Sequence, residues 1–217
     1  MIFVSDSVIR PQIQRLSVFR RFMTKIKIFS KTEALALAVI SVILISVFVP
    51  NLMASLRRSR DQIRRDDLGV MVHFVDEYFV DLGVFPPSSS DGKIMDCLKP
   101  GDAPYKDKKG QWVIDAIPCE WGKDAFSNLI TGKTYISALP RDPDWEEGVE
   151  YYYLSDGARY QLFTAMEGVD EAEVDLRILS KGYPCGNRIC NVGRTYGCEI
   201  PKTLKECQEE AAALLKK

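Results

Sequence analysis

The chain has 217 residues, 46% of them hydrophobic and 27% charged, and a formal net charge of −1. A nearly neutral chain lacks the excess of Lys and Arg that accompanies nucleic-acid binding, so we expect no direct nucleic-acid partner. The informative charge pattern is local, because the first 31 residues carry seven Lys and Arg side chains against one acid, Asp6. Such a basic flank is expected to stay on the cytoplasmic side of a membrane.

An apolar run follows the basic flank. Residues 34–56 are 23 residues without charge, and ~20 apolar residues of helix suffice to cross a bilayer. The sequence therefore predicts a single-pass membrane helix in contact with lipid. Glu33 places a carboxylate at the start of this run, where an unpaired acid is costly and marks a functional candidate. Pro50 removes one helical hydrogen bond near the far end and favours a kink.

The helical pattern continues beyond the apolar run. Apolar residues recur at helical spacing as far as Leu82, and Gly83 followed by Pro86-Pro87 is typical of a helix end. We expect one helix from about Lys31 to Leu82. Its outer half should bury one stripe and expose the arginines and Asp61 on the opposite face. The stripe comprises Leu52, Leu56, Ile63, Val70, Met71, Phe74, Val75, Tyr78, Phe79 and Leu82.

Strand patterns appear only in the second half of the chain. Residues 149–154 and 159–166 are rich in aromatic and β-branched side chains, and the turn residues 155–158 lie between them, which predicts a β-hairpin. We expect a third strand near 174–179 and a loop over 183–201. The preceding stretch, from residue 88 to about residue 140, is expected to be loop with short ordered pieces.

A capping box predicts a short helix at the end of the chain. Thr203 and Glu206 have the spacing in which each side chain accepts the backbone N–H of the other residue. The expected fold is α+β, with a long helix packed on a small antiparallel sheet. We divide the chain into a basic cytoplasmic leader, the transmembrane half of the long helix, its amphipathic half and an extracytoplasmic head domain, at residues 1–28, 29–56, 57–82 and 83–217.

All six cysteines follow the apolar run: Cys97, Cys119, Cys185, Cys190, Cys198 and Cys207. An even set on one side of a membrane indicates disulfides in an oxidising compartment, which places the head outside the cytoplasm. A Cys97–Cys119 bond would pin the loop after the long helix, and pairings among the last four would staple the terminal helix to the sheet. Their connectivity stays open. A zinc site fits less well, because CxxC pairs are absent.

These features together resemble the type IV pilins and the pseudopilins of type II secretion systems. Phe29-Ser30-Lys31-Thr32-Glu33 matches the family pattern of an aromatic residue with Glu four residues later, and Pro50 falls at the family spacing. Residues 60–87 look like the exposed half of a pseudopilin helix, and 139–143 and 151–157 look like the strands of the same group. The resemblance covers about residues 25–180.

The resemblance implies a structural role without catalysis. It implies a homo-oligomeric filament built through Phe29, Glu33 and Pro50, with Glu33 pairing with the N-terminal amine of a neighbouring subunit. The implied partners are the inner-membrane assembly machinery and a prepilin peptidase that cuts between Ile28 and Phe29, with methylation as a further processing step. The implied location is the inner membrane, or an extracellular filament once assembled.

One residue departs from the family pattern. The peptidase usually cuts after a glycine, and here that position is Ile28. If Ile28 blocks cleavage, no free amine forms at Phe29 and the leader stays on. The alternative is then a membrane-tethered extracytoplasmic binding domain that does not polymerise. An inner-membrane enzyme is a third, weaker option.

Patterns for catalysis or cofactor binding are weak. His73 is the only histidine and lies in the long helix, so a Ser-His-Asp site in the head is impossible. Residues 127–134 nearly match a phosphate-binding loop, but Ser127 replaces its first glycine. The acids around Asp142 and Asp144 could supply oxygen ligands to calcium, an ion that the resemblance also suggests. Such a cluster is more commonly a solvated turn whose acids bind the backbone. We expect no other cofactor.

Overall fold

The computed structural model describes residues 30–99, 101–129 and 131–214. It has an α+β fold with one long helix, small antiparallel sheets and three disulfides. The chain divides into two compact units, Met1–Ala54 and Ser55–Lys217. The described part of the first unit is helical, and its large apolar side chains are exposed. The rest of this section concerns the second unit.

Helix α2 runs without interruption over Lys31–Leu82, as the sequence predicted. It contains Pro50, which the helix accommodates, because a proline removes only one bond of the hydrogen-bond ladder. The helix ends at Gly83, which has a φ of 73° and donates its N–H to Phe79 O at 2.7 Å. A positive φ is easy only for glycine, so Gly83 is the helix stop that the sequence indicated.

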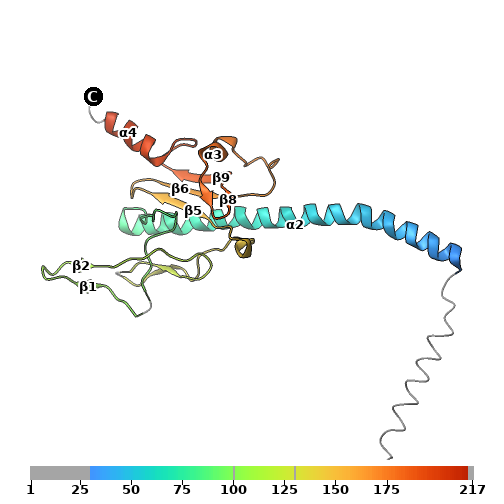
Figure 1. The fold of residues 1–217 in the computed structure, drawn as a ribbon. Coiled ribbons are helices and arrows are strands. Elements are labelled where there is room, and N and C mark those ends of the chain that lie inside the picture. The colour runs from blue at the N-terminus through green and yellow to red at the C-terminus, as the bar shows by residue number, and fades with distance from the viewer. Residues whose placement is uncertain (1–29, 100, 130, 215–217) are drawn as a thin grey trace, which may run out of the picture. The chain divides into compact units, whose positions relative to one another are not determined.

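The outer half of α2 packs against a three-stranded antiparallel sheet with the order β5-β6-β9 (Figure 1). The strands are β5 Tyr152–Ser155, β6 Tyr160–Thr164 and β9 Val192–Tyr196. The predicted hairpin is confirmed: Tyr152 pairs with Phe163, and Asp156 in the turn accepts the backbone N–H of Arg159 at 2.7 Å. The central strand β6 is buried along its whole length.

Both faces of this sheet are covered, which explains the continuous tyrosine run of β5. Tyr151 and Tyr153 belong to the core under α2, while Tyr152 and Phe163 belong to a second cluster on the other face. Successive residues of a strand point to opposite faces, so both faces need apolar side chains here. The core under α2 contains Leu68, Met71, Phe74, Val75 and Tyr78 from the helix.

The predicted third strand is wrong. Residues 174–179 lie mostly in helix α3, Leu176–Lys181, because the Asp175 side chain caps it by accepting the N–H of Arg177 and Gly182 ends it. The third strand is β9, from the stretch expected to be loop. Its period-2 pattern is hidden because Gly193 occupies a position where any larger side chain would meet the ring of Phe163.

Shorter elements complete the second unit. The stretch after α2 forms two ribbons, a small hairpin lies in the chain between β6 and β9, and a terminal helix follows β9. These elements are β1 Tyr105–Lys106 with β2 Trp112–Val113, β3 Phe126–Ser127 with β4 Thr134–Ile136, the 3-10 turn η1 Trp145–Glu147, β7 Pro184–Cys185 with β8 Arg188–Ile189, and α4 Leu204–Leu214. The capping box of α4 is confirmed, because Glu206 accepts the N–H of Thr203 at 2.6 Å and Thr203 accepts that of Glu206 at 3.2 Å.

The predicted burial of α2 needs one correction. Five side chains of the predicted stripe are exposed, whereas Asp61 and Arg64 are only 1% and 0% exposed. The exposed members are Leu52, Leu56, Ile63, Val70 and Leu82. The helix therefore presents charge, as well as apolar side chains, to the interior. A hydrophobic stripe cannot reveal this, since it scores charged residues as surface.

Candidate functional site

Glu33 has a local partner at the start of α2. Its carboxylate accepts the backbone N–H of Ser30 at 2.8 Å, and the Ser30 hydroxyl accepts the N–H of Glu33 at 3.3 Å. This is a second capping box, with the same spacing as Thr203 and Glu206. The spacing of Ser30 and Glu33 is the sequence signal for this cap, and the prediction for Glu33 did not include it. Ile28 and Phe29, the predicted processing residues, lie outside the described residues.

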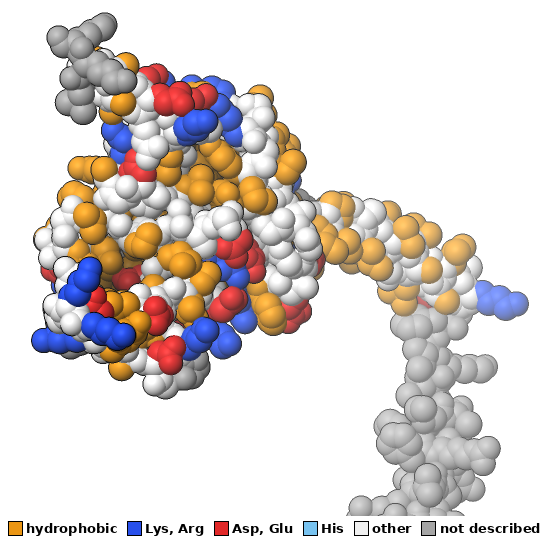
Figure 2. All heavy atoms as spheres, turned by 60° about the vertical axis from the view of Figure 1, so that its left-hand side comes forward, with side chains coloured by type: hydrophobic (Ala, Val, Ile, Leu, Met, Phe, Trp, Pro, Cys, Tyr) orange, Lys and Arg blue, Asp and Glu red, His pale blue; other side chains and the backbone are white. Residues whose placement is uncertain are grey.

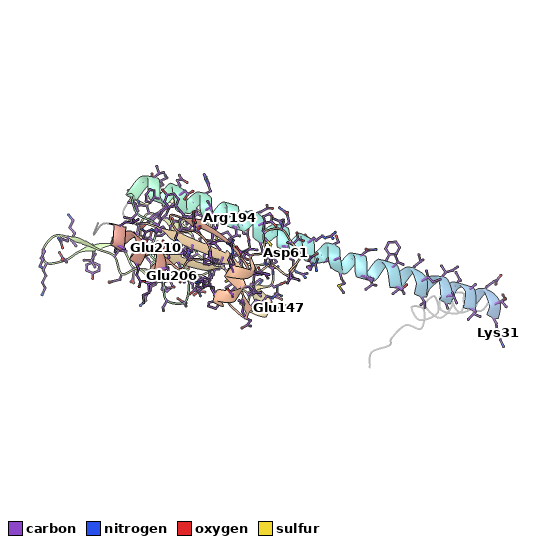
Figure 3. The ribbon with its side chains drawn as sticks, turned by 90° about the horizontal axis from the view of Figure 1, so that it is seen from above. Lys31, Asp61, Glu147, Arg194, Glu206 and Glu210 are labelled. Carbon is purple, nitrogen blue, oxygen red and sulfur yellow. A yellow bond between two sulfur atoms is a disulfide. The ribbon has the colours of Figure 1, made fainter. Side chains whose placement is uncertain are left out.

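The second unit contains a buried cluster of ion pairs, which we call the Arg64 cage. It consists of Arg64 and the carboxylates of Asp61, Asp142, Asp144 and Glu167. Arg64 donates to both oxygens of Asp142 at 2.8 and 2.9 Å and to Asp144 at 2.8 Å. Its remaining nitrogen donates to Asp61 at 2.9 Å and Glu167 at 3.0 Å. A guanidinium has five N–H groups, so each has an acceptor. Figure 3 shows Asp61 on α2.

This satisfaction of every donor is what makes the burial tolerable. The side chains of Arg64 and Asp142 are 0% exposed, and a buried charge without partners is strongly destabilising. Burial acts to lower the pKa of Arg64, but the bonds to Asp142, Glu167 and Asp144 outweigh it and raise the pKa. Arg64 therefore stays charged at all ordinary pH values.

The Arg64 cage contains the two residues, Asp142 and Asp144, that the sequence suggested as calcium ligands. The carboxylates of Asp142 and Asp144 both bind Arg64, and the side chain of Asp142 is 0% exposed. Arg188 adds a second cation at 2.9 Å from Asp144. Within the described residues, no group of three or more acidic, histidine or cysteine side chains is arranged to hold a metal ion. The oxygens expected to bind calcium are thus bound by guanidinium groups.

Residues 167–173, which we call the strap, lie along α2 and are tied to it by ion pairs. Asp61 accepts the backbone N–H groups of Glu167 and Gly168, each at 2.9 Å. Arg60 binds Glu167 through two bonds of 2.7 and 2.6 Å. The other pairs are Arg57 with Asp170 at 3.4 Å and Arg65 with Glu173 at 2.8 Å. The arginines of α2 that sequence reasoning placed in solvent thus hold a loop.

Another buried acid, outside the Arg64 cage, lies near the Tyr78 end of the core. Asp96 is 9% exposed, and its Oδ2 is buried without a hydrogen-bond partner in the described chain. Burial raises the pKa of Asp96 to about 6, although its bond with the Tyr78 hydroxyl opposes the rise. Acids with raised pKa values are frequent at functional sites but also occur in structural clusters. Nothing in the sequence singled out Asp96.

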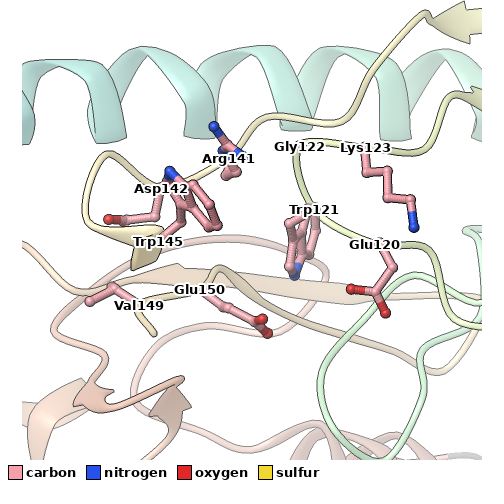
Figure 4. A pocket seen from close by; sticks show the side chains of 9 residues that line it. All are labelled: Glu120, Trp121, Gly122, Lys123, Arg141, Asp142, Trp145, Val149 and Glu150. Atoms are coloured by element: carbon pink, nitrogen blue, oxygen red, sulfur yellow. The ribbon is translucent and has the colours of Figure 1, made fainter. Parts of the chain in front are cut away.

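A pocket of about 240 Å³ opens between the turn before β3 and the segment around η1 (Figure 4). Its walls include Trp121, Trp145 and Arg141, whose guanidinium lies 3.9 Å from the centre of the Trp145 ring. Glu120 and Glu150 line the same pocket. Its volume lies below the ~300–1,000 Å³ of typical small-molecule sites. The pocket suits a single side chain or a small ring.

The six cysteines form three disulfides: Cys97–Cys119, Cys185–Cys190 and Cys198–Cys207. The predicted Cys97–Cys119 bond is confirmed. Cys198–Cys207 joins the segment after β9 to α4, as expected of a staple between sheet and terminal helix. With every cysteine paired, a zinc site made of these cysteines is excluded, because a disulfide leaves no thiolate to bind the metal.

The remaining sequence candidates do not come together as a catalytic site in the described chain. His73 is exposed on α2. Ser127 and Thr134, the two ends of the near match, pair across strands β3 and β4, whereas a phosphate-binding loop joins a strand to a helix. On the face shown in Figure 2, acidic and basic side chains are interspersed. Comparisons with protein-family models, curated proteins and solved structures find no match to this chain.

Proposed function

We propose that the chain is a structural, non-enzymatic subunit of a type IV pilus or a type II secretion pseudopilus. The observation that carries this proposal is helix α2. It is long and apolar enough to cross a membrane, and its outer half completes the core of a disulfide-bonded α+β domain. A helix that belongs to a membrane and to a head domain at once suits a subunit that is stored in lipid and then assembled.

Assembly exchanges lipid contacts for helix contacts. The apolar side chains of residues 34–56 would leave the bilayer and pack against the same run of neighbouring subunits, while the heads form the filament surface. The disulfides support an extracytoplasmic location for the heads, and the basic residues before the apolar run support a cytoplasmic location for that flank. Glu33 would then neutralise the terminal amine of its neighbour, because a buried carboxylate needs a charged partner.

A non-polymerising membrane-tethered binding domain is the second candidate. Two observations favour it: Ile28 stands where the family has glycine, and the Glu33 carboxylate already has a partner in its own chain, the N–H of Ser30. In this alternative, Glu33 only begins a helix. The head would present its pocket or surface to a partner in the extracytoplasmic space.

The intact mass of the protein extracted from its native membrane tests the choice directly. A chain beginning at Phe29 is expected for a filament subunit. A chain still carrying the residues before Phe29 would favour the tether. The same sample, separated into membrane and sheared-filament fractions, reports whether the protein leaves the membrane at all.

Replacing Glu33 separates its two roles. Glutamine also serves in a capping box, so Glu33→Gln keeps the helix start and removes the charge. The filament proposal expects Glu33→Gln to lose filament incorporation, while Ser30→Ala, which removes the cap partner and leaves the charge, retains it. Normal incorporation of Glu33→Gln would remove the charge from the assembly mechanism.

A further inference from the structure

The pocket between the turn before β3 and the segment around η1 contains charges that the fold does not use. Arg141 is exposed and lies over the ring of Trp145, but it forms no hydrogen bond or ion pair with any described residue. The side chain of Glu150 is 45% exposed, and the nearest cation among the described residues is Lys93, at 3.9 Å. One guanidinium and one carboxylate of the same pocket are therefore free to bind a ligand.

The other charged groups around this pocket do not give it a net charge. Glu120 accepts from Lys93 at 3.1 and 3.2 Å, and Asp142 is held by Arg64. Lys123 is exposed. The charged lining residues together with Lys93 balance, because the three cations are Lys93, Lys123 and Arg141 and the three acids are Glu120, Asp142 and Glu150. This balance favours a ligand that carries both signs of charge rather than a simple anion or cation.

Arg141 and Glu150 line the same pocket without reaching each other. Their charged atoms lie more than 4.0 Å apart, since the two side chains form no ion pair. In the view of Figure 4 they lie on opposite sides of the pocket, with the rings of Trp121 and Trp145 between them. Two opposite charges held apart across a pocket are both satisfied by a ligand whose own charges have the reverse order.

The surrounding chain holds this arrangement in place. Any side chain at Gly122 would overlap the stem of Arg141, so the glycine allows that stem to lie against the backbone. The N–H of Gly122 donates to Leu139 O at 3.0 Å, which ties the turn to the segment that leads to Arg141. Trp121 and Val149 are 8% and 1% exposed and give the pocket an apolar floor. A site that is already formed loses little conformational entropy on binding.

We propose that this pocket binds a small zwitterion, namely a free α-amino acid with an apolar side chain. Arg141 binds the carboxylate through two parallel hydrogen bonds, because stacking on Trp145 leaves the edge of the guanidinium free. Glu150 accepts the ammonium group, and the apolar side chain lies against Trp121 and Val149. A volume of about 240 Å³ suits a ligand of this size. The site goes beyond the proposed function and does not depend on it, because assembly uses neither Arg141 nor Glu150.

Calorimetric titration of the full chain in a nonionic detergent tests the ligand class. L-valine is compared with L-valinamide, which has no carboxylate, and with N-acetyl-L-valine, which has no ammonium group. We expect saturable binding of L-valine and at least about tenfold weaker binding of each analogue, because each analogue leaves one charged group of the pocket without its partner. No binding of L-valine, or equal binding of either analogue, would overturn the proposal.

Four variants test the place of binding. Arg141→Met keeps an apolar stem on Trp145 and removes the guanidinium, and Glu150→Gln keeps the shape and removes the charge. Each should weaken L-valine binding at least about tenfold. Arg194→Met and Glu146→Gln, at exposed charges outside the pocket, should leave it unchanged.

Unchanged binding in both pocket variants, or equal losses in the two controls, would show that the ligand binds elsewhere. The analogues are measured on the unsubstituted chain, so the ligand class is tested even if a variant fails to fold. Filament incorporation of the same variants, measured in parallel, should be normal. A chain that enters filaments without binding L-valine would contradict the amino-acid site alone and leave the assembly proposal standing.

Discussion

The buried face of the outer half of α2 is held to the head in two different ways. At Asp61 and Arg64 the contact is ionic, with a guanidinium enclosed by carboxylates. Three turns later, at Phe74 and Tyr78, the contact is aromatic, and both rings lie within 5.3 Å of the ring of Phe126. One face of the helix therefore combines directional ionic contacts with non-directional aromatic packing.

This difference indicates which of the two contacts fixes the axial position of α2 against the head. Aromatic rings pack in several offsets with similar energy, whereas the Arg64 cage needs all five N–H groups to meet their acceptors. An axial shift of the helix by one residue would leave buried charges unpaired. We infer that the cage sets the position of α2 under the sheet and that the aromatic core contributes most of the apolar burial.

Removing the central cation should give the largest effect. Arg64→Met keeps the length of the side chain but removes the cation that four carboxylates share, and breaking a buried ion pair in this way costs about 3–5 kcal/mol. We expect the free energy of unfolding of the full chain in detergent, measured by urea denaturation at pH 7, to fall by this amount. The loss should shrink in acid, because protonation neutralises the stranded carboxylates.

Phe74→Ala is the control from the aromatic end. A large-to-small change at a buried ring costs about 3–5 kcal/mol through lost burial and the cavity left behind. Its loss should stay constant between pH 7 and pH 4. If the two variants show the same dependence on pH, the two ends of the helix face do not differ in kind.

Glu167 should give a smaller effect with a defined pH dependence. Its bonds to Arg60, and then to Arg64, lower its pKa from 4.5 to about 2, which corresponds to at most about 3 kcal/mol of stability. A lowered pKa stabilises the fold above the unfolded value. The contribution is therefore complete above about pH 4.5 and is lost as the pH falls toward 2. Glu167→Gln should destabilise at pH 7 and match the parent near pH 2; a difference that persists there would assign the effect to packing.

The stability linked to Asp96 should depend on pH in the opposite direction to that of Glu167. Burial raises its pKa from 3.8 to about 6, so the charged form opposes folding. Stability linked to its proton is complete below pH 3.8 and is lost as the pH rises through 6. We expect Asp96→Asn to raise the free energy of unfolding by up to about 2–3 kcal/mol at pH 8, and to leave it unchanged below pH 4. Destabilisation at pH 8 would mean that the ionised carboxylate has a stabilising partner.

The sequence predicted the parts of this fold that local patterns encode. The bounds of α2, the hairpin turn at Asp156 and the capping box at Thr203 all depend on neighbours within a few residues. The Arg64 cage does not: Arg64 meets Asp142 and Glu167, which lie 78 and 103 residues later. An arginine that faces solvent and one that is enclosed by distant acids look the same in a periodic pattern.

The candidate site residues follow the same division. The Cys97–Cys119 bond could be proposed, because the two cysteines lie only 22 residues apart in the stretch that follows the long helix. Asp142 was proposed as a calcium ligand because it belongs to an acidic cluster, but its partner in the structure is Arg64 of α2. The third strand was missed because Gly193 and the nearby cysteines interrupt its pattern, although Val192 is buried beside Thr164 of β6.

The exposed ion pairs at the far end of α2 should give the smallest effect. Lys133 reaches Asp81 at 2.6 Å and Glu77 at 2.9 Å, but its side chain is 44% exposed. Water and salt screen such pairs, so their distances overstate their contribution. We expect Lys133→Ala to leave the midpoint of urea unfolding unchanged within error at both low and high salt. A loss comparable to that of Arg64→Met would show that the number of ion pairs, rather than their burial, decides how charge holds this helix.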